Sequence, residues 1–374
     1  MNLLRAVTLG SRRGAYGGPY DTALRQSTLA SARGFAVRLI AGSFRGDAPS
    51  VRPEGPVVDA EFPVVKRWIP LPAFTAVFSI GWLRRMVQSL RWADVLHLSI
   101  AREAIPIVTL ALAETMHVRT VLQPHGMLTS RTSRLHRVID VFLRPLVRRA
   151  SVLIALTQRE ATALADWLGP ATGPPILVIG NPVPDVERAH LPSESRSPTE
   201  VLAVSRLHPR KRIDVFVDAA EEAGRREWDE NYRLVGPDEG EAARLNLRQN
   251  GAERAVVWEG PVPESEVQGR LSRASVFVLC SQAEPWGNVL MLAIAMGKPV
   301  VVTASAAMAS EVERLGCGIV VDDGDAIGLA EAVHRVVSQS GLYARLAART
   351  AAFQALHLDQ AAVQERLVEA YEGR

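Results

Sequence analysis

The chain has 374 residues, of which 48% are hydrophobic and 22% charged, a balance that suits a globular protein of about two domains and excludes disorder over most of its length. Its two cysteines, Cys280 and Cys317, are too few for a disulfide framework, and no cysteine–histidine cluster has the spacing of a structural zinc site. The net charge of +3 hides an asymmetry, since residues 1–185 carry 22 basic and 12 acidic side chains and residues 186–374 carry 21 and 28.

Short apolar runs in the first half are typical of β-strands, and helical patterns separate them. The strand candidates, in chain order, are 5–10, 36–41, 94–99, 120–124, 152–157 and 176–180. Helix-period segments lie between them, for example at 20–33, 102–116, 134–149 and 158–168. Gly34 follows the first of these helices at the position where a C-terminal glycine is common.

The same alternation restarts after a polar stretch at 186–199, which has the composition of a linker. The strand candidates of the second half are 200–205, 232–236, 255–260, 275–280, 299–304 and 318–322. Residues from about 325 to 374 are helical by composition and contain no strand candidate. The second half therefore repeats the organisation of the first and ends in helices.

Strands that alternate with helices favour parallel sheets covered by helices on both faces. We therefore predict an α/β protein of two Rossmann-like, doubly wound domains, the first at 1–185 and the second at 186–374. The last helix can pack back on the first domain. Ligands of such sheets bind beyond the carboxyl ends of the strands, and in the cleft where two such domains face each other. Functional residues are thus expected in strand-to-helix loops.

No segment is predicted to cross a membrane. The N-terminus lacks the apolar core of a signal peptide, and the longest uncharged run, 16 residues at 68–83, is shorter than the ~20 residues of a spanning helix. We expect a cytoplasmic protein. The basic first half and the stretch 68–85 leave open peripheral contact with the inner membrane face, and the alternative is a buried amphipathic helix at 73–90. Nucleic acid is disfavoured as a partner because no recognition motif accompanies the charge.

The first loop with a chemical signal is SRRGAYGGPYD at 11–21. Gly14, Gly17 and Gly18 permit a close approach of the backbone, and the start of the following helix offers amides to an anion. The pattern is not GxGxxG, so a plain flexible loop is an equal alternative.

A histidine follows the strand at 120–124 in the sequence PHGML. His125 stands at the carboxyl end of this strand, where its side chain can donate a hydrogen bond to a sugar hydroxyl or to a developing charge. A lone histidine more often has a structural role, and position alone does not exclude that role here.

The loop VSRLHPRKR follows the first strand of the second domain and contains two cations of interest, Arg206 and Lys211. Arg206 and Lys211 lie beside the start of the next helix, where positive charge opposes the helix dipole unless an anion is bound. A diphosphate would account for both. The alternative is a solvated basic turn.

The loop SQAEPWGNVL at 281–290 opens an apolar helix. Glu284 is favoured near a helix start by the dipole, so capping is the structural alternative. A carboxylate beside free amides can equally accept hydrogen bonds from sugar hydroxyls while the amides bind other oxygens.

Taken together, these stretches resemble the family-4 retaining glycosyltransferases of the GT-B fold. The most specific are PHGML, VSRLHPRKRID and SQAEPWGNVLMLAIAMGKPVVVT, and the weaker ones are IGNPVPD, RLVGPDEGE and GCGIVVDDGD. The resemblance covers nearly the whole chain, in order and at family-like spacing. It implies transfer of a sugar from a nucleotide-diphosphate sugar with retention of configuration, without a required metal or other cofactor. The implied acceptor is a glycan, a lipid-linked molecule or a small molecule, as in polysaccharide biosynthesis.

The resemblance also assigns roles to residues. Arg206 and Lys211 match the pair that neutralises the donor diphosphate, and His125 matches the histidine near the reacting carbon. Glu284 matches a glutamate that holds donor-sugar hydroxyls. Further donor contacts would come from the loop glycines and from the residues that follow Glu284, namely Gly17, Gly18, Trp286, Gly287, Asn288, Val289 and Leu292.

One departure concerns Leu292, where the family motif has a second glutamate that binds the ribose. Its loss would weaken donor binding by roughly 1.5–3 kcal/mol, but the cations that stabilise the leaving group are retained. The rival interpretation is a catalytically silent relative that binds a sugar nucleotide or a partner transferase. The sequence identifies neither the sugar, the nucleotide, the acceptor nor the oligomeric state.

Overall fold

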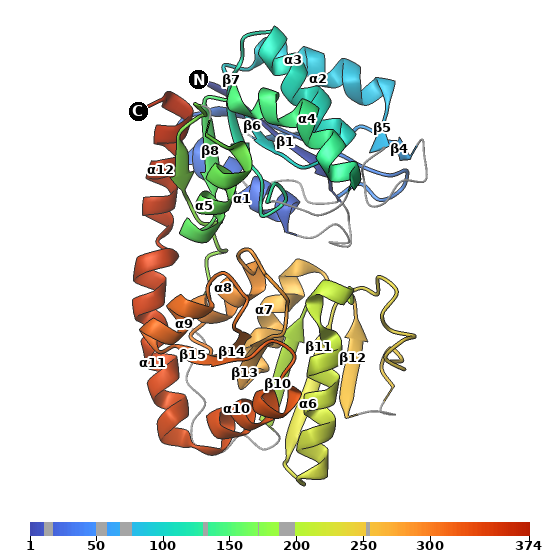
Figure 1. Cartoon of the computed structure of the whole chain (residues 1–374), viewed down its shortest axis with the longest axis vertical. Helices are drawn as coiled ribbons and strands as arrows, with labels where there is room; N and C mark the ends of the chain where they lie inside the picture. Colours follow the sequence, from blue (N-terminus) through green and yellow to red (C-terminus); the bar gives the residue numbers. More distant parts are fainter. Residues whose placement is uncertain are drawn as a thin grey trace. The chain divides into compact units, whose positions relative to one another are not determined.

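The computed structural model describes residues 1–10, 18–49, 58–67, 77–129, 134–170, 172–186, 199–251 and 255–374. The chain divides into two compact units (Figure 1). Unit 1 consists of Met1–Pro182 together with Gln360–Arg374, and unit 2 of Val183–Asp359. The sequence-based boundary, 185/186, lies three residues further along the chain. The last segment of the range predicted for the second domain, Gln360–Arg374, belongs to unit 1, in agreement with the expectation that the last helix packs back on the first domain.

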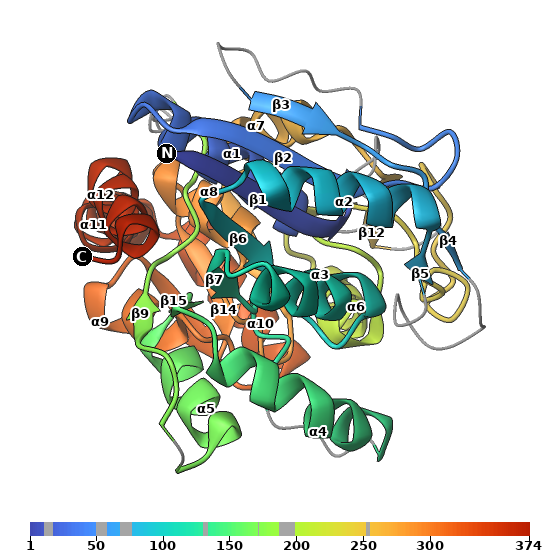
Figure 2. The ribbon, with the colours of Figure 1, turned by 90° about the horizontal axis from the view of Figure 1, so that it is seen from above.

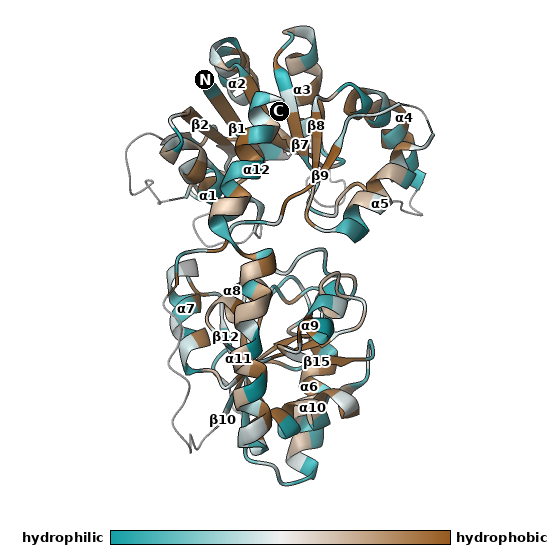
Figure 3. Cartoon of the chain, turned by 90° about the vertical axis from the view of Figure 1, so that its left-hand side faces the viewer, coloured by the Kyte–Doolittle hydropathy of each residue, from teal (hydrophilic) through white to brown (hydrophobic). Residues whose placement is uncertain are grey.

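Unit 1 is built on a parallel sheet with the strand order β3-β2-β1-β6-β7-β8-β9. Its strands are β1 (Asn2–Leu9), β2 (Ala36–Gly42), β3 (Val58–Glu61), β6 (Val95–Ser99), β7 (Arg119–Gln123), β8 (Val152–Ala155) and β9 (Ile176–Val178). A separate two-stranded ladder pairs β4 (Lys66–Arg67) with β5 (Val77–Phe78). β1, β2, β8 and β9 are mostly brown, the hydrophobic colour, in Figure 3, as expected for strands of a sheet covered on both faces.

Helices cover the two faces of this sheet. Successive residues of β1 point to opposite faces, so Leu4 joins the core under α2 (Ile80–Trp92), α3 (Ala104–Thr115), α4 (Arg134–Arg148) and α5 (Gln158–Leu168), while Leu3 joins the core on the other face. α2, α3 and α4 lie side by side (Figure 2). α1 (Pro19–Ala32) packs on β2 and on α12 (Gln360–Glu372).

The C-terminal helix α12 is an integral part of unit 1. Tyr371 is fully buried, and its hydroxyl lies 2.8 Å from Nδ1 of His97 in β6. The Gln364 side chain donates to the carbonyl of Leu29 at 2.7 Å. Unit 1 thus takes its covering helices from both ends of the chain.

Unit 2 has a second parallel sheet, with the order β12-β11-β10-β13-β14-β15. Its strands are β10 (Thr199–Val204), β11 (Glu230–Val235), β12 (Val256–Gly260), β13 (Val276–Leu279), β14 (Val300–Thr303) and β15 (Gly318–Val321). The helices are η1 (Pro209–Lys211), α6 (Ile213–Arg225), α7 (Glu264–Arg273), α8 (Asn288–Ala295), α9 (Ala309–Leu315), α10 (Ala326–Ser338) and α11 (Ser340–His357). α6 and α10 pack together over one core, and α8, α9 and α10 each contact α11.

Each strand predicted from the sequence corresponds to an observed strand, with ends that differ by a few residues, and the prediction of doubly wound α/β sheets is confirmed. Gly34 has a φ of +87° directly after α1, as expected for its position. β3, β4 and β5 are short and are not predicted from the sequence. The helix expected at 73–90 begins only at Ile80, and Trp82, Met86 and Leu90 bury its apolar stripe. Residues 68–76 of the stretch considered for membrane contact lie outside the described ranges.

Both sheets reverse their strand order beside their first strand. In unit 1 the reversal lies between β1 and β6, and in unit 2 between β10 and β13. The carboxyl ends of the strands at such a point diverge into loops that leave an opening for a ligand. No helix within the described parts of the chain is long and apolar enough to cross a bilayer.

Gly236 allows the end of β11 to approach the end of β10. Its φ is +144°, and a Cβ at this position would lie 1.9 Å from the carbonyl oxygen of Ser205. The amide of Gly236 donates to the carbonyl of Gly260, and its carbonyl accepts from the Trp258 indole, both at 2.9 Å. The glycine therefore has backbone on both sides and no room for a side chain.

We predict that Gly236→Ala lowers the free energy of unfolding by roughly 2–4 kcal/mol, because backbone must move. The matched control is Gly269→Ala in α7, where a Cβ meets nothing within 4 Å. That change should stabilise by about 0.5–1 kcal/mol through the helix propensity of alanine. Urea denaturation measures both, and equal stabilities of the two variants would contradict the packing described here.

Candidate functional site

The loops at the carboxyl edge of the unit 2 sheet bring most of the predicted donor residues together. Lys211 is the last residue of η1, after β10, and Glu284 follows β13, so the two flank the point where the strand order reverses. Lys211 Nζ lies 2.5 Å from Glu284 Oε2. Their side chains are 22% and 14% exposed. This ion pair is largely shielded from solvent but is still reachable from it.

The second predicted cation is also paired. Arg206 follows β10 and donates from Nη1 to Glu239 Oε1 at 2.6 Å. Glu239 comes from the loop after β11, the strand that neighbours β10 on its other side. Both side chains are about one-third exposed, at 36% and 28%. Arg206 and Lys211 therefore each have a carboxylate from an adjacent loop as their present partner.

Backbone hydrogen bonds hold the loops against one another. The Gln282 amide donates to the carbonyl of Arg210 at 2.8 Å, which ties the loop after β13 to the loop after β10. Ala283 has a φ of +50°, and its amide donates to Ser305 Oγ at 2.9 Å. The carbonyl of Glu284 accepts from the Ala307 amide at 2.8 Å. Glu284 is thus fixed from the side of β14 as well.

The start of α8 follows Glu284 directly. Gly287 is its N-cap residue, with a φ of +78° and no side-chain cap. The first-turn amides of an uncapped helix can donate to an anion or to sugar oxygens. Asn288 and Val289 begin this helix and are partly exposed. The opening of α8 is therefore where the predicted main-chain donors Asn288 and Val289 lie.

Two other residues of these loops have polar atoms without a partner. The Trp286 indole, in a side chain that is only 4% exposed, and the Ser205 hydroxyl are buried and make no hydrogen bond within the described ranges. Buried polar atoms without partners are uncommon in native proteins and often mark a site for a ligand or water. Leu292, by contrast, is 5% exposed. Its side chain presents little surface to any ligand.

The predicted histidine lies in unit 1. His125 follows β7, has a φ of +50°, and its Nε2 lies 3.2 Å from Oγ of Ser99 at the end of β6. Arg5 of β1 donates to the same hydroxyl oxygen at 2.9 Å. Burial, reinforced by the Arg5 charge, lowers the pKa of His125 to about 3. The imidazole is therefore neutral at physiological pH and keeps one N–H donor.

Arg5 is fully buried, and its partners within the described ranges are neutral. It donates to Gln26 Oε1 at 3.2 Å and to the carbonyls of Ala6 and His97 at 3.0 and 3.1 Å. Burial lowers the pKa of Arg5 to about 10, which leaves the guanidinium charged. A buried cation without a carboxylate supplies positive potential beside His125 and disfavours its protonation.

The glycine loop is only partly covered by the structure. Gly17 lies outside the described residues. Gly18 is the N-cap residue of α1, with no side-chain cap, and its carbonyl accepts from the Thr22 amide at 2.9 Å. Pro19, the first residue of α1, has no N–H, so within the described residues the first-turn donors of this helix begin only at Tyr20.

Three residues of this description were not identified from the sequence. Glu239 lies in RLVGPDEGE, one of the stretches that resemble the family weakly. Its sequence does not indicate that the Glu239 carboxylate pairs with Arg206. Arg5 and Ser99 lie in strands whose apolar pattern indicates only burial. Their role near His125 depends on the pairing of β1, β6 and β7, which no local signal specifies.

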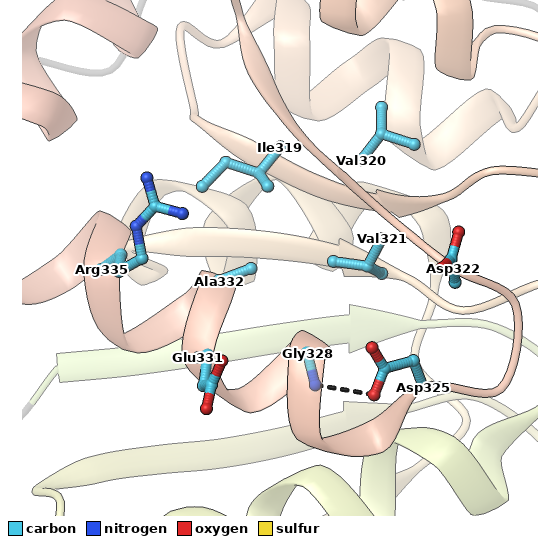
Figure 4. Close-up of a pocket in the computed structure, with 9 residues that line it drawn as sticks. All are labelled: Ile319, Val320, Val321, Asp322, Asp325, Gly328, Glu331, Ala332 and Arg335. Carbon is cyan, nitrogen blue, oxygen red and sulfur yellow. Dashed lines mark hydrogen bonds between the residues drawn. The ribbon is translucent and has the colours of Figure 1, made fainter.

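An open pocket of about 300 Å³ lies elsewhere in unit 2, between the edge strand β15 and α10 (Figure 4). Asp322, Asp325, Glu331 and Arg335 contribute its charged groups, and Asp325 accepts a hydrogen bond from the Gly328 amide at 2.8 Å. Three carboxylates and one guanidinium repel a diphosphate. None of the predicted site residues lines this pocket, so we assign the candidate site to the loops after β10, β11 and β13.

Comparison with known proteins identifies the family and the fold. The family model described as Glycosyltransferase Family 4 matches residues 17–187, and the one described as Glycosyl transferases group 1 matches residues 198–339. Solved structures that cover the whole chain share the GT-B fold. Sucrose-phosphate synthase from Thermosynechococcus elongatus has a TM-score of 0.75 at 18% identity and is covered to 98% of its length. HepE from Anabaena, in complex with UDP-glucose, has a TM-score of 0.73 at 19% identity and is covered completely.

The protein belongs to the group 1, family-4-like glycosyltransferases. Among curated relatives, the lipopolysaccharide core biosynthesis glycosyltransferase LpsE of Rhizobium meliloti is 29% identical over 172 residues. That match covers 44% of this chain and 46% of LpsE, so the chain spans about half the length of this relative.

We predict that Glu239→Gln tightens the binding of inorganic pyrophosphate by about two- to fivefold, because it frees Arg206 from a partly screened ion pair. Titration calorimetry measures the affinity. Glu222→Gln is the matched control, since Glu222 pairs with Arg225 and Arg226 on α6. If both variants bind pyrophosphate equally, Arg206 does not contact the anion.

Proposed function

We propose that this protein transfers a sugar from a nucleotide-diphosphate sugar to an acceptor, with retention of the anomeric configuration and without a metal ion. The observation that carries the proposal is the pair of cations at the carboxyl edge of the unit 2 sheet, beside the strand-order reversal. Family membership and the UDP-glucose bound by HepE support a sugar nucleotide as the donor.

In this proposal, Arg206 and Lys211 bind the donor diphosphate. When the bond between the anomeric carbon and the phosphate oxygen breaks, the electron pair stays on the diphosphate, and the two cations stabilise its added charge. The acceptor hydroxyl forms the new bond to the anomeric carbon, and its proton passes to the diphosphate oxygen that has left that carbon. Two fixed cations can perform for the leaving group what a divalent metal does in other enzymes.

Glu284 has two successive partners in this proposal. Without a ligand its carboxylate pairs with Lys211. A diphosphate competes for Lys211, and the released carboxylate can then accept hydrogen bonds from donor-sugar hydroxyls. The ion pair thus keeps both side chains in position before the donor binds.

The remaining contacts are proposed from the resemblance and from local structure. The neutral imidazole of His125 would donate to the sugar near the reacting carbon, and its hydrogen bond with Ser99 would hold its orientation. The uncapped start of α8 supports donor contacts by the main chain of the residues that follow Glu284. Gly17 and Gly18 would close over the phosphates. The burial of Leu292 argues against a direct contact with the ribose.

The acceptor is a glycan, a lipid-linked molecule or a small molecule, and none of the described contacts selects among them. A catalytically silent protein that binds a sugar nucleotide or a partner transferase is the rival function. The absence of the second motif glutamate at Leu292 is the observation that favours it. Release of nucleoside diphosphate from the donor distinguishes the two, because only an active enzyme produces it.

The test begins with thermal-shift measurements against uridine, guanosine, adenosine and thymidine diphosphates and their sugars. With the sugar nucleotide that stabilises most, slow hydrolysis without acceptor is followed as release of nucleoside diphosphate. We predict that Arg206→Met and Lys211→Met each weaken nucleotide binding and lower this release by roughly ten- to a hundredfold, because a charge-assisted contact is lost.

Arg225→Met is the matched control, since it removes an exposed cation of α6 that pairs with Glu222. The control should retain full activity, and all three variants should melt near the wild-type temperature. Strong destabilisation by both site variants would make these cations structural. Tight nucleotide binding without any release would instead support the silent relative.

A further inference from the structure

The outer side of α4 is the most apolar exposed helix face within the described ranges. Ten large hydrophobic side chains are exposed in the described parts of the chain, and four of them belong to this one helix. Val138, Val141 and Phe142 are 59%, 68% and 69% exposed, and Leu135 is 37% exposed. They recur at intervals of three and four residues, so they lie on one side of the helix. We call them, together with Arg134 and Arg137, the α4 face.

The opposite side of the helix already provides its packing. Leu143 and Val147 are fully buried in the core under α2–α5. α4 thus carries two apolar stripes, and one is sufficient to attach it to the sheet. Singly exposed apolar residues need no explanation, but a contiguous exposed stripe commonly marks an interaction surface.

The charges around the exposed stripe are all positive. Arg134, Arg137, Arg144 and Arg148 lie on α4, and Arg149 follows it directly. No ion pair holds Arg134 or Arg137 within the described ranges. Arg144 lies over the Trp167 ring at 5.4 Å and Arg148 donates to the carbonyl of Leu168, so the first two are the freer cations.

The one acidic residue of α4 does not offset this charge. Asp140 accepts hydrogen bonds from Arg102 at 2.7 and 2.9 Å and from the Trp167 indole at 3.0 Å, on the inner side of the helix. Burial alone would raise the pKa of the Asp140 carboxyl, but these hydrogen bonds outweigh it and lower the pKa. Asp140 is therefore ionised, and the Arg102 guanidinium on the inner side of the helix balances its charge.

We infer that the α4 face binds the surface of an anionic lipid bilayer, with its apolar stripe among the upper acyl chains and its arginines at the phosphates. An apolar stripe flanked by arginines is the pattern of helices that lie in a membrane interface. A second copy of the chain, paired through the same face, would bring arginines against arginines. The phosphate backbone of a nucleic acid would use the charge and leave the apolar stripe exposed to water.

This surface differs from the stretch at 68–85 that the sequence analysis considered. Of that stretch, the described part of α2 buries Trp82, and the apolar stripe of the helix faces the core. The inference rests on α4 alone and does not depend on the proposed glycosyl transfer.

Vesicle co-sedimentation tests the inference, with pure phosphatidylcholine compared with an equimolar mixture of phosphatidylcholine and phosphatidylglycerol. The intact chain should bind the mixed vesicles and bind neutral vesicles weakly. Arg134→Gln/Arg137→Gln should reduce partitioning into the mixed vesicles by roughly thirtyfold, at about fivefold per arginine. Val138→Ser/Val141→Ser/Phe142→Ser should reduce it by at least about tenfold.

Each variant has a matched control in unit 2. Arg345→Gln/Arg349→Gln removes two exposed arginines of α11, and Ile327→Ser/Leu356→Ser removes two exposed apolar side chains. Both controls should bind vesicles like the wild type. The α4 variants should keep the wild-type melting temperature and wild-type release of nucleoside diphosphate in solution, which separates a failure here from a failure of the proposed function.

The inference is overturned if the intact chain binds neither kind of vesicle, or if the α4 variants bind as tightly as their controls. It is also overturned if light scattering finds a dimer that the apolar variant dissociates while vesicle binding is absent, because the occupant of the face would then be a second copy of the chain.

Discussion

Charge balance at the carboxyl edge of the β10–β13 reversal is the constraint on which the candidate site depends. Parallel strands deliver their loops to one edge of the sheet, so cations after β10 meet carboxylates from the loops after β11 and β13. Partly shielded charges need partners, and here the partners are side chains that a ligand can replace. An anion that binds Arg206 and Lys211 therefore replaces Glu239 and Glu284 as their partner, so both cations still have a negatively charged partner.

The two units have similar strand orders, but their charged groups are arranged differently. In unit 2, side chains at the sheet edge pair with each other and remain partly exposed. In unit 1, the Arg5 charge is fixed within the sheet, and its partners within the described ranges are neutral. Burial, reinforced by this charge, lowers the pKa of the neighbouring His125 imidazole and keeps it unprotonated. A neutral histidine can donate a hydrogen bond without adding a second positive charge beside Arg5.

Local patterns in the sequence predicted the strands, most helices and the loops that carry Lys211, Glu284 and His125. They did not predict Glu239 or Arg5 as partners, because these contacts depend on which strands become neighbours. On α4, Val141 and Leu143 are equally apolar, and only the packing on the sheet shows which of them stays outside. The short strands β3–β5 carry too few residues for a periodic signal.

Binding to a Glu284→Gln variant tests the central claim most directly. Calorimetry should compare the nucleoside diphosphate that stabilises the protein most with the corresponding sugar nucleotide. The exchange of partners predicts that this variant binds the nucleoside diphosphate more tightly than the wild type, since Lys211 is free, and gains nothing further from the sugar. Equal weakening of both ligands, or no change in either, would contradict it.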